Sequence, residues 1–181
     1  YQDMFSYSFG WCGFIYNMND IHNLNKENTI KSSLFKNTKT HITNFYFPQL
    51  LLLSNVENHS IEDRSIENHD TIVKNDINLK KNIIITGPNA SGKTTIIKGI
   101  GINVLISQQI GFGFYNKANI NLYSKIHSYI NIPDTSDRDS LFQAEARRCN
   151  NIIKETMNNK KHLCIFDELY SGTNTEEAIA C

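Results

Sequence analysis

The chain has 181 residues, a formal net charge of +0 and a hydrophobic content of 40%. This length allows one domain and a little more, and the apolar fraction is enough for a real core. Because the charge is balanced, any contact with nucleic acid would have to come from another domain or from a local patch.

The four cysteines show no C-x-x-C pairing, which argues against a zinc site and fits a reducing compartment. The longest apolar stretch near the start, Phe9 to Tyr16, is too short and too interrupted to span a bilayer. The basic region and cleavage site of a signal peptide are also missing. We therefore expect an intracellular protein, cytoplasmic or nuclear, with no membrane partner.

The two ends of the sequence predict a piece of a longer protein. It starts at Tyr1 with no initiator Met, and it stops at Cys181 within what reads as a helix. Residues 1–47 carry aromatic, weakly periodic segments and are expected to end a preceding region and its linker. Residues 48–181 are expected to form the main domain, truncated at its C-terminus.

From residue 42 onward, elements of both kinds are predicted at short intervals. The pattern predicts strands over 42–53 (ending in a Pro turn), 73–79, 83–86, 123–132 and 162–166, and helices over 94–110 and 141–157. The intervening acidic and aperiodic residues, 55–70, are typical of a solvated loop. Alternating strands and helices predict an α/β domain with a mostly parallel sheet flanked by helices.

The clearest motif, at residues 87–94, matches the G-x-x-x-x-G-K-[ST] phosphate loop between a predicted strand and a predicted helix. Its glycines let backbone N–H groups turn toward an oxyanion, and the helix that starts near Lys93 points its positive end at the same phosphates. Lys93 supplies a point charge for the β- and γ-phosphates, and the Thr94 hydroxyl is placed to ligate Mg²⁺. The motif therefore predicts binding of a nucleoside triphosphate. The residues expected to contact it are Gly87, Pro88, Asn89, Ala90, Ser91, Gly92, Lys93, Thr94 and Thr95.

A second motif indicates what happens to the nucleotide. The apolar run 162–166 ends in Asp167-Glu168, as a central strand does when it delivers acids to a ligand crevice. Asp167 would hold Mg²⁺ directly or through water. Glu168 suits the catalytic general base that orients and deprotonates the attacking water. The alternative for Glu168 is a helix N-terminal acid favoured by the helix dipole.

Further segments accompany these two motifs. They are Pro88-Asn89 within the loop, Ser171-Gly172-Thr173-Asn174-Thr175 after the two acids, Asn75-Asp76-Ile77 with Leu79, Gln109-Ile110-Gly111-Phe112, and the stretch 126–145. The interval between the motifs is 167 − 93 = 74 residues. Together these features resemble the ATPase domain of the MutS DNA mismatch-repair family over residues 70–181. The resemblance implies a P-loop NTPase of ABC-ATPase type, a Mg-dependent ATPase.

The same resemblance implies roles for single residues. ATP and Mg²⁺ would be the cofactors, with the metal on Thr94 and Asp167 and the γ-phosphate on the side-chain amide of Asn89. Ser140 would reach across a dimer to the γ-phosphate held by the other subunit, although a helix N-cap is an alternative role for it. Residues Gly172, Thr173, Asn174 and Thr175 would form a loop at the subunit interface.

The resemblance also implies partners. A second MutS-like subunit would complete a homo- or heterodimer, and double-stranded DNA would bind through domains outside this sequence. Closure of the dimer, driven by ATP, would be coupled to DNA binding. Residues 1–47 would then be the end of a helical, lever-like region that precedes the ATPase domain.

Departures from the family pattern keep other functions open. Ala90-Ser91 replaces the family's Met-Gly, Leu141 stands where Thr is expected, and the one Phe-x-Glu sequence, Phe166 to Glu168, is already used by a strand. Mismatch recognition is therefore not predicted from this sequence. The main alternative is an ABC-type ATPase of another machine, SMC-like or a transporter, although the L-S-G-G-Q signature is missing. A third is a binding module whose incomplete ATPase serves only as an interaction surface.

Overall fold

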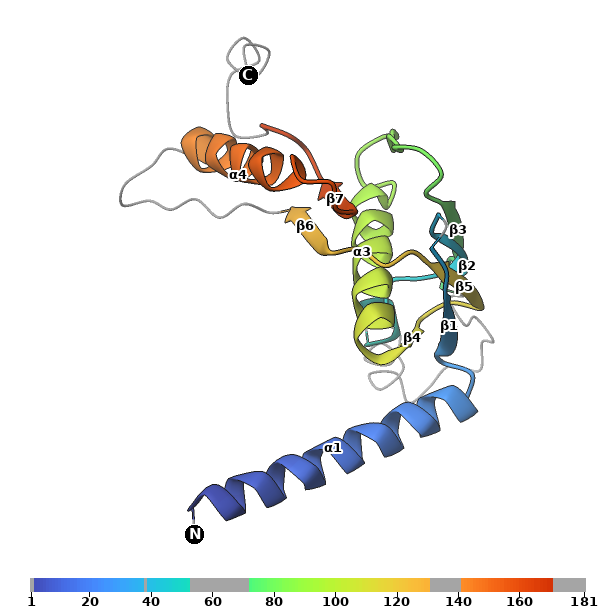
Figure 1. Cartoon of the computed structure of the whole chain (residues 1–181). Helices are drawn as coiled ribbons and strands as arrows, with labels where there is room; N and C mark the ends of the chain where they lie inside the picture. Colours follow the sequence, from blue (N-terminus) through green and yellow to red (C-terminus); the bar gives the residue numbers. More distant parts are fainter. Residues whose placement is uncertain (1, 38, 53–71, 131–140, 171–181) are drawn as a thin grey trace, which may run out of the picture.

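The computed structural model describes residues 2–37, 39–52, 72–130 and 141–170. A body of strands and helices carries one long helix, α1, that projects from it (Figure 1). The elements in chain order are α1 (Gln2–Lys26), β1 (Lys31–Phe35), β2 (His41–Phe45), β3 (Asn75–Asn78), α3 (Lys93–Ile110), β4 (Phe112–Gly113), β5 (Lys117–Ile120), β6 (Lys125–Tyr129), α4 (Leu141–Thr156) and β7 (His162–Phe166).

Most of the predicted elements are present. The predicted helices over 94–110 and 141–157 are α3 and α4, and the predicted strands over 73–79, 123–132 and 162–166 contain β3, β6 and β7. Helix α3 ends at Gly111, which has a φ of 78° and donates its N–H to the Ser107 carbonyl at 2.9 Å. A glycine at this point ends a helix readily because the left-handed conformation costs it nothing.

The prediction of a mostly parallel sheet is wrong for the larger sheet. Its five strands lie in the order β3-β2-β5-β1-β4, and β5 and β1 are its one parallel pair; the other three neighbouring pairs are antiparallel. Strands β6 and β7 form a separate parallel pair. Parallel neighbours need a crossover of a dozen or more residues. Helix α4 supplies that crossover between β6 and β7. The fold is therefore mixed α/β.

The predicted strand over 83–86 is also absent: this run has no ladder partner among the described residues. Ile83 is 45% exposed and Ile84 is 90% exposed, while Ile85 packs against the core. The prediction rested on apolar content, and apolar content alone does not supply a neighbouring strand for the backbone.

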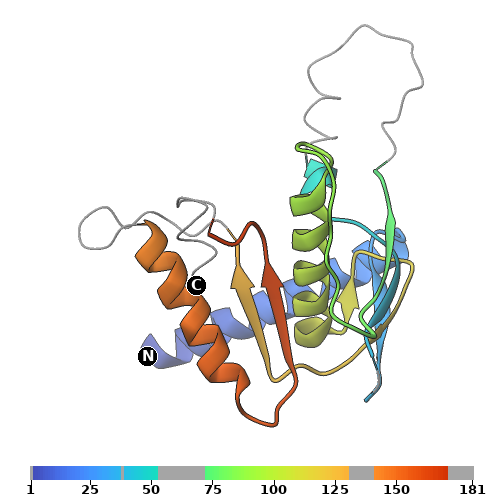
Figure 2. The ribbon, with the colours of Figure 1, turned by 90° about the horizontal axis from the view of Figure 1, so that it is seen from above.

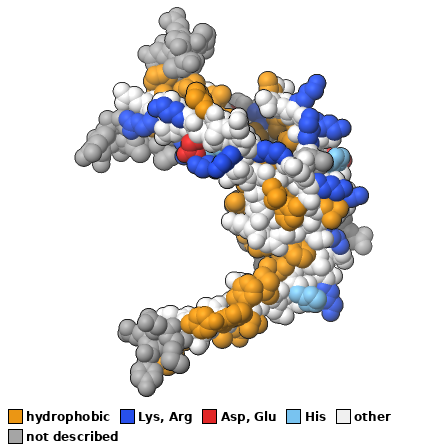
Figure 3. All heavy atoms as spheres, viewed as in Figure 1, with side chains coloured by type: hydrophobic (Ala, Val, Ile, Leu, Met, Phe, Trp, Pro, Cys, Tyr) orange, Lys and Arg blue, Asp and Glu red, His pale blue; other side chains and the backbone are white. Residues whose placement is uncertain are grey.

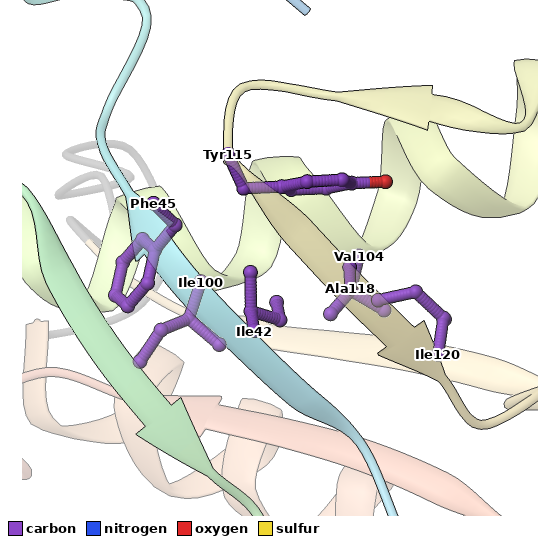
Figure 4. Close-up of a cluster of buried hydrophobic side chains, with 7 residues drawn as sticks. All are labelled: Ile42, Phe45, Ile100, Val104, Tyr115, Ala118 and Ile120. Atoms are coloured by element: carbon purple, nitrogen blue, oxygen red, sulfur yellow. The ribbon is translucent and has the colours of Figure 1, made fainter. Parts of the chain in front are cut away.

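The core lies between α3 and the five-stranded sheet (Figure 4). Its buried side chains are Ile42, Phe45, Ile100, Val104, Tyr115, Ala118 and Ile120. The buried amide of Asn103 fastens the helix to the sheet, because its Nδ2 donates to the Tyr46 carbonyl at 3.0 Å and its Oδ1 accepts the Phe114 N–H at 2.7 Å. This network satisfies backbone groups that burial would otherwise leave unpaired.

The two-stranded sheet lies on the other side of α3 (Figure 2). A Cβ atom on Gly101 of α3 would come within 2.7 Å of Ile165 Cδ1 of β7, so helix and strand touch at this glycine. The arrows of β6 and β7 point toward the end of the molecule at which α3 begins (Figure 2). The carboxyl end of β7 and the amino end of α3 therefore share one edge of the fold.

Helix α1 carries an apolar surface (Figure 3). Its large hydrophobic side chains that are at least half exposed are Phe5, Tyr7, Phe9, Trp11, Phe14, Ile15 and Tyr16. After α1 the chain enters the five-stranded sheet, where β2 pairs with β3. This pairing joins residues on either side of the predicted domain boundary between 47 and 48, and that boundary stays a prediction.

None of the described helices combines the length and the apolar character needed to cross a membrane.

Candidate functional site

The phosphate loop, residues 87–94, turns directly into α3. Gly92 adopts a φ of 88°, and the first helical bond runs from the Ile96 N–H to the Gly92 carbonyl at 3.0 Å. The Lys93 ammonium bends back and donates to the carbonyls of Gly87 at 2.9 Å and Pro88 at 2.8 Å. An ammonium has three donors, so these two bonds hold it over the loop and leave capacity for a further oxygen.

The amino end of α3 suits an anion. No side chain caps it, and its first turn holds no acidic residue. The first N–H groups of a helix have no partner within the helix and carry its positive end, so they are available to a phosphate. A Cβ atom on Gly87 would lie 2.9 Å from Ser91 Oγ, so glycine lets the two ends of the loop close on each other. The residues present therefore fit a nucleotide phosphate.

Backbone strain gathers at the same edge of the fold. Five non-glycine residues in the described part of the chain have positive φ, and two of them are Asn28 and Asn44, a residue type that tolerates it. The other three are Ala90 at 60°, Glu168 at 49° and Tyr170 at 56°. They lie in the phosphate loop and in the segment directly after β7. Strain of this kind costs on the order of 1–3 kcal/mol at each residue and clusters at functional sites.

The carboxylate segment, residues 167–170, continues from β7. The Asp167 N–H donates to the Tyr129 carbonyl at 2.9 Å, which extends the parallel ladder between β6 and β7 by one bond. Asp167 is half-buried and Glu168 is exposed. Carboxylate and hydroxyl oxygens are the ligands that Mg²⁺ prefers, so Asp167 and Thr94 form a suitable donor set.

One contact links the two elements that carry or lead into predicted site residues, and several other predicted residues lie outside the described part of the chain. The contact between Gly101 and Ile165 places α3, which carries Lys93 and Thr94 in its first turn, beside β7, which leads into Asp167 and Glu168. The predicted residues Ser140, Gly172, Thr173, Asn174 and Thr175 lie outside the described residues.

Sequence reasoning missed an aromatic cluster behind the carboxylate segment. Tyr129 is 1% exposed, its hydroxyl accepts the Tyr170 N–H at 3.3 Å, and its ring packs on Phe166 at a centroid distance of 5.6 Å. The ring of Tyr170 lies 5.7 Å from that of Phe142 on α4. Burial raises the pKa of the Tyr129 hydroxyl, which therefore stays protonated near neutral pH. The sequence signalled Tyr129 only as an apolar position in a strand.

The guanidinium of Arg148 on α4 faces β6. Its Nε and Nη2 donate to the Ser128 carbonyl at 3.2 and 2.9 Å. The guanidinium thus ties α4 to β6, and this structural contact explains the position of Arg148 without any bound ligand.

The fold has mixed α/β layers, a phosphate loop that opens a helix, and a strand beside that helix that leads into two acids. These features are typical of the P-loop class of domain. A sequence model described as MutS domain V matches residues 83–181. That match covers more than half of the chain, so the chain belongs to the MutS family.

Curated relatives agree with this assignment. The DNA mismatch repair protein MSH3 of Scheffersomyces stipitis is 33% identical over 159 residues, which are 84% of this chain and 14% of the relative. MSH3 of Debaryomyces hansenii is 31% identical over 73% of this chain and 13% of its own length. The DNA mismatch repair protein MutS of Finegoldia magna is 35% identical over 59% of this chain and 12% of its own length. The chain thus spans about one eighth of the length of these relatives.

Proposed function

We propose that this chain is the ATP-binding and ATP-hydrolysing domain of a MutS-like DNA mismatch-repair protein. One observation carries the proposal: α3 begins with no side-chain cap and with Lys93 bent over the phosphate loop, and the same helix contacts β7, the strand that leads into Asp167 and Glu168. Membership of the MutS family supports ATP as the nucleotide.

The residues of the site have separate tasks in this proposal. The backbone of residues 87–92 and the Lys93 ammonium hold the β- and γ-phosphates, and Asn89 donates its amide to the γ-phosphate. Thr94 and Asp167 hold Mg²⁺, which when bound neutralises charge that develops on the phosphoryl oxygens. Glu168 accepts a proton from the attacking water and orients it in line with the leaving oxygen.

The proposal extends to assembly. Ser140 and residues 172–175 act across an interface with a second MutS-like subunit, so residues 1–181 alone are expected to be inactive as an ATPase. Binding of ATP at two shared sites closes the dimer and hydrolysis reopens it, which changes how further domains hold double-stranded DNA. Family membership supports this scheme, and the relatives matched here carry the name of mismatch repair proteins.

The test compares the native full-length protein that contains this sequence with its Glu168→Gln variant. ATP hydrolysis and ATP binding are both measured with and without heteroduplex DNA. We expect Glu168→Gln to lower turnover by about 100-fold or more with ATP binding retained, because the amide cannot accept the proton of the water. DNA is expected to change the turnover of the unaltered protein.

The matched control is Glu155→Gln. Glu155 is a partly exposed carboxylate on α4 that pairs with Lys125 at 2.7 Å, away from the carboxylate segment. Glu155→Gln should leave the turnover of ATP unchanged. Full activity of Glu168→Gln would remove the general-base assignment, and turnover that is indifferent to every DNA tested would favour an ABC-type ATPase of another machine.

A further inference from the structure

The segment that holds Glu168 has no regular structure of its own to fix it. It follows β7, and two of its four residues, Glu168 and Tyr170, have positive φ. A non-glycine residue keeps such a conformation only when its surroundings enforce it. The contacts on either side of Glu168 therefore show what orients its carboxylate.

One residue makes both of those contacts. The Tyr129 carbonyl accepts the N–H of Asp167 at 2.9 Å, and the Tyr129 hydroxyl accepts the N–H of Tyr170 at 3.3 Å. These two bonds grip the chain immediately before Glu168 and two residues after it. Because Tyr129 is 1% exposed and belongs to β6, it is a fixed support for the turn between Asp167 and Tyr170.

The hydroxyl of Tyr129 also lies near α4. Glu145 of that helix, which is 2% exposed, is one of the groups that raise the pKa of this hydroxyl, after burial itself. The ring of Tyr170 also packs on Phe142 in the first turn of α4. Helix α4 thus contacts the carboxylate segment through Phe142.

We infer that Tyr129 is a positioning residue for Glu168, and that its hydroxyl fixes the turn of the carboxylate segment through the N–H of Tyr170. This inference rests on the proposed function, since it assigns Tyr129 to the same hydrolytic site. Tyr129 does not touch the nucleotide in this scheme. It acts through the backbone of residues 167–170.

The test is Tyr129→Phe in the native full-length protein, which keeps the ring and removes only the hydroxyl. We expect kcat for ATP to fall about tenfold to 100-fold, because small displacements of a catalytic group have effects of this size. KM and ATP binding should stay the same, since the phosphate loop is untouched. Amide hydrogen exchange at Tyr170 should become faster, because its acceptor is gone.

The matched control is Tyr115→Phe. Tyr115 is also a buried tyrosine, 2% exposed, and its hydroxyl bonds to Ser107 at 2.9 Å in the core beneath α3. Loss of the Tyr115 hydroxyl should lower the free energy of unfolding by about as much as Tyr129→Phe does, and it should leave kcat unchanged. A merely structural role for Tyr129 would make the two variants alike in kcat.

Glu168→Gln, measured in the same assay, distinguishes failure of the positioning role of Tyr129 from failure of the proposed function. If Glu168→Gln abolishes turnover while Tyr129→Phe keeps full kcat, the positioning role is overturned and the proposed function stands. If Glu168→Gln is fully active, the hydrolytic assignment itself fails. A drop in kcat with faster exchange at Tyr170 supports the inference.

Discussion

In the phosphate-loop half of the candidate site, residues 87–95 with α3, backbone groups form the proposed binding surface. In the carboxylate half, residues 167–170 with β6, β7 and α4, buried side chains hold the backbone in place. Lys93 bonds to two carbonyls of its own loop, at sequence separations of five and six residues. Tyr129 contacts Tyr170 from 41 residues away. Contacts within a loop, such as those of Lys93, can be recognised from a short sequence motif. Contacts between distant residues, such as Tyr129 and Tyr170, cannot.

The two halves also differ in how they are joined to the rest of the fold. The phosphate-loop half is fastened by the amide network of Asn103 and the core beneath α3. The carboxylate half meets it at the contact of Gly101 with Ile165. Each of these features can be altered by a single substitution. The largest effect is expected on nucleotide binding, and the smallest on the pH dependence of stability.

The largest effect is expected for Lys93→Ala, which tests whether the phosphate-loop half binds the nucleotide without help from the other half. Loss of the one cation over the loop should weaken binding of Mg·ATP by about 100-fold or more, because charged hydrogen bonds to phosphate contribute about 1.5–3 kcal/mol each. Calorimetric titration measures it. Lys98→Ala, on the same helix outside the loop, should bind normally, and equal binding by both variants would contradict this role for Lys93.

The next effect concerns the attachment of α3 to the larger sheet. Asn103→Ala would leave the Phe114 N–H and the Tyr46 carbonyl buried without their partner. We expect the free energy of unfolding to fall by about 2–4 kcal/mol, since each stranded polar group costs about 1–3 kcal/mol. Urea denaturation gives the value. The exposed Asn116, changed to Ala, should shift it by less than about 0.5 kcal/mol.

A smaller effect is expected at the junction of the two halves. In Gly101→Val, the new Cβ atom would meet Ile165 Cδ1 at 2.7 Å, and overpacking of this kind costs about 1–3 kcal/mol. Adding Ile165→Val removes the Cδ1 atom and should restore most of the lost stability. If the double variant is no more stable than Gly101→Val alone, α3 and β7 do not meet at this point.

The smallest effect is a pH dependence within the carboxylate half. His127 is 7% exposed; burial lowers its pKa below the usual 6.5, although Glu155 opposes this, and its Nε2 lies 2.8 Å from His162 Nδ1. The unfolded chain therefore binds a proton more readily than the folded one. Stability should be complete above pH 6.5 and should fall as the pH drops through 6.5 toward the lower pKa of the folded state.

Free energies of unfolding at pH 7.5 and 5.5 measure this dependence. We expect the unaltered protein to lose stability between these values, and His127→Gln to lose less. The exposed His22 on α1, changed to Gln, is the control and should keep the full loss. An unchanged pH dependence in His127→Gln would show that this side chain is not its source.

How much of the molecule was predictable depends on the range of the interactions involved. The phosphate loop, the helix after it and the strand before Asp167 follow from neighbouring residues, so motif and periodicity predicted them. The directions of the strands in the larger sheet depend on which segments pair, and the alternation of elements did not reveal this. The exposed run at 83–86 was misread for the same reason.

By itself, the sequence predicted the loop to which we assign a phosphate, because a G-x-x-x-x-G-K-T loop needs only its own backbone and the helix that follows it. Only the tertiary structure decided what stands behind Glu168. Tyr129 and Phe142 come from β6 and α4, and they meet the carboxylate segment because β7 lies beside β6 and α4 packs against β6. Contacts between residues far apart in the chain produce no periodic pattern in the sequence, so they are seen only in the folded structure.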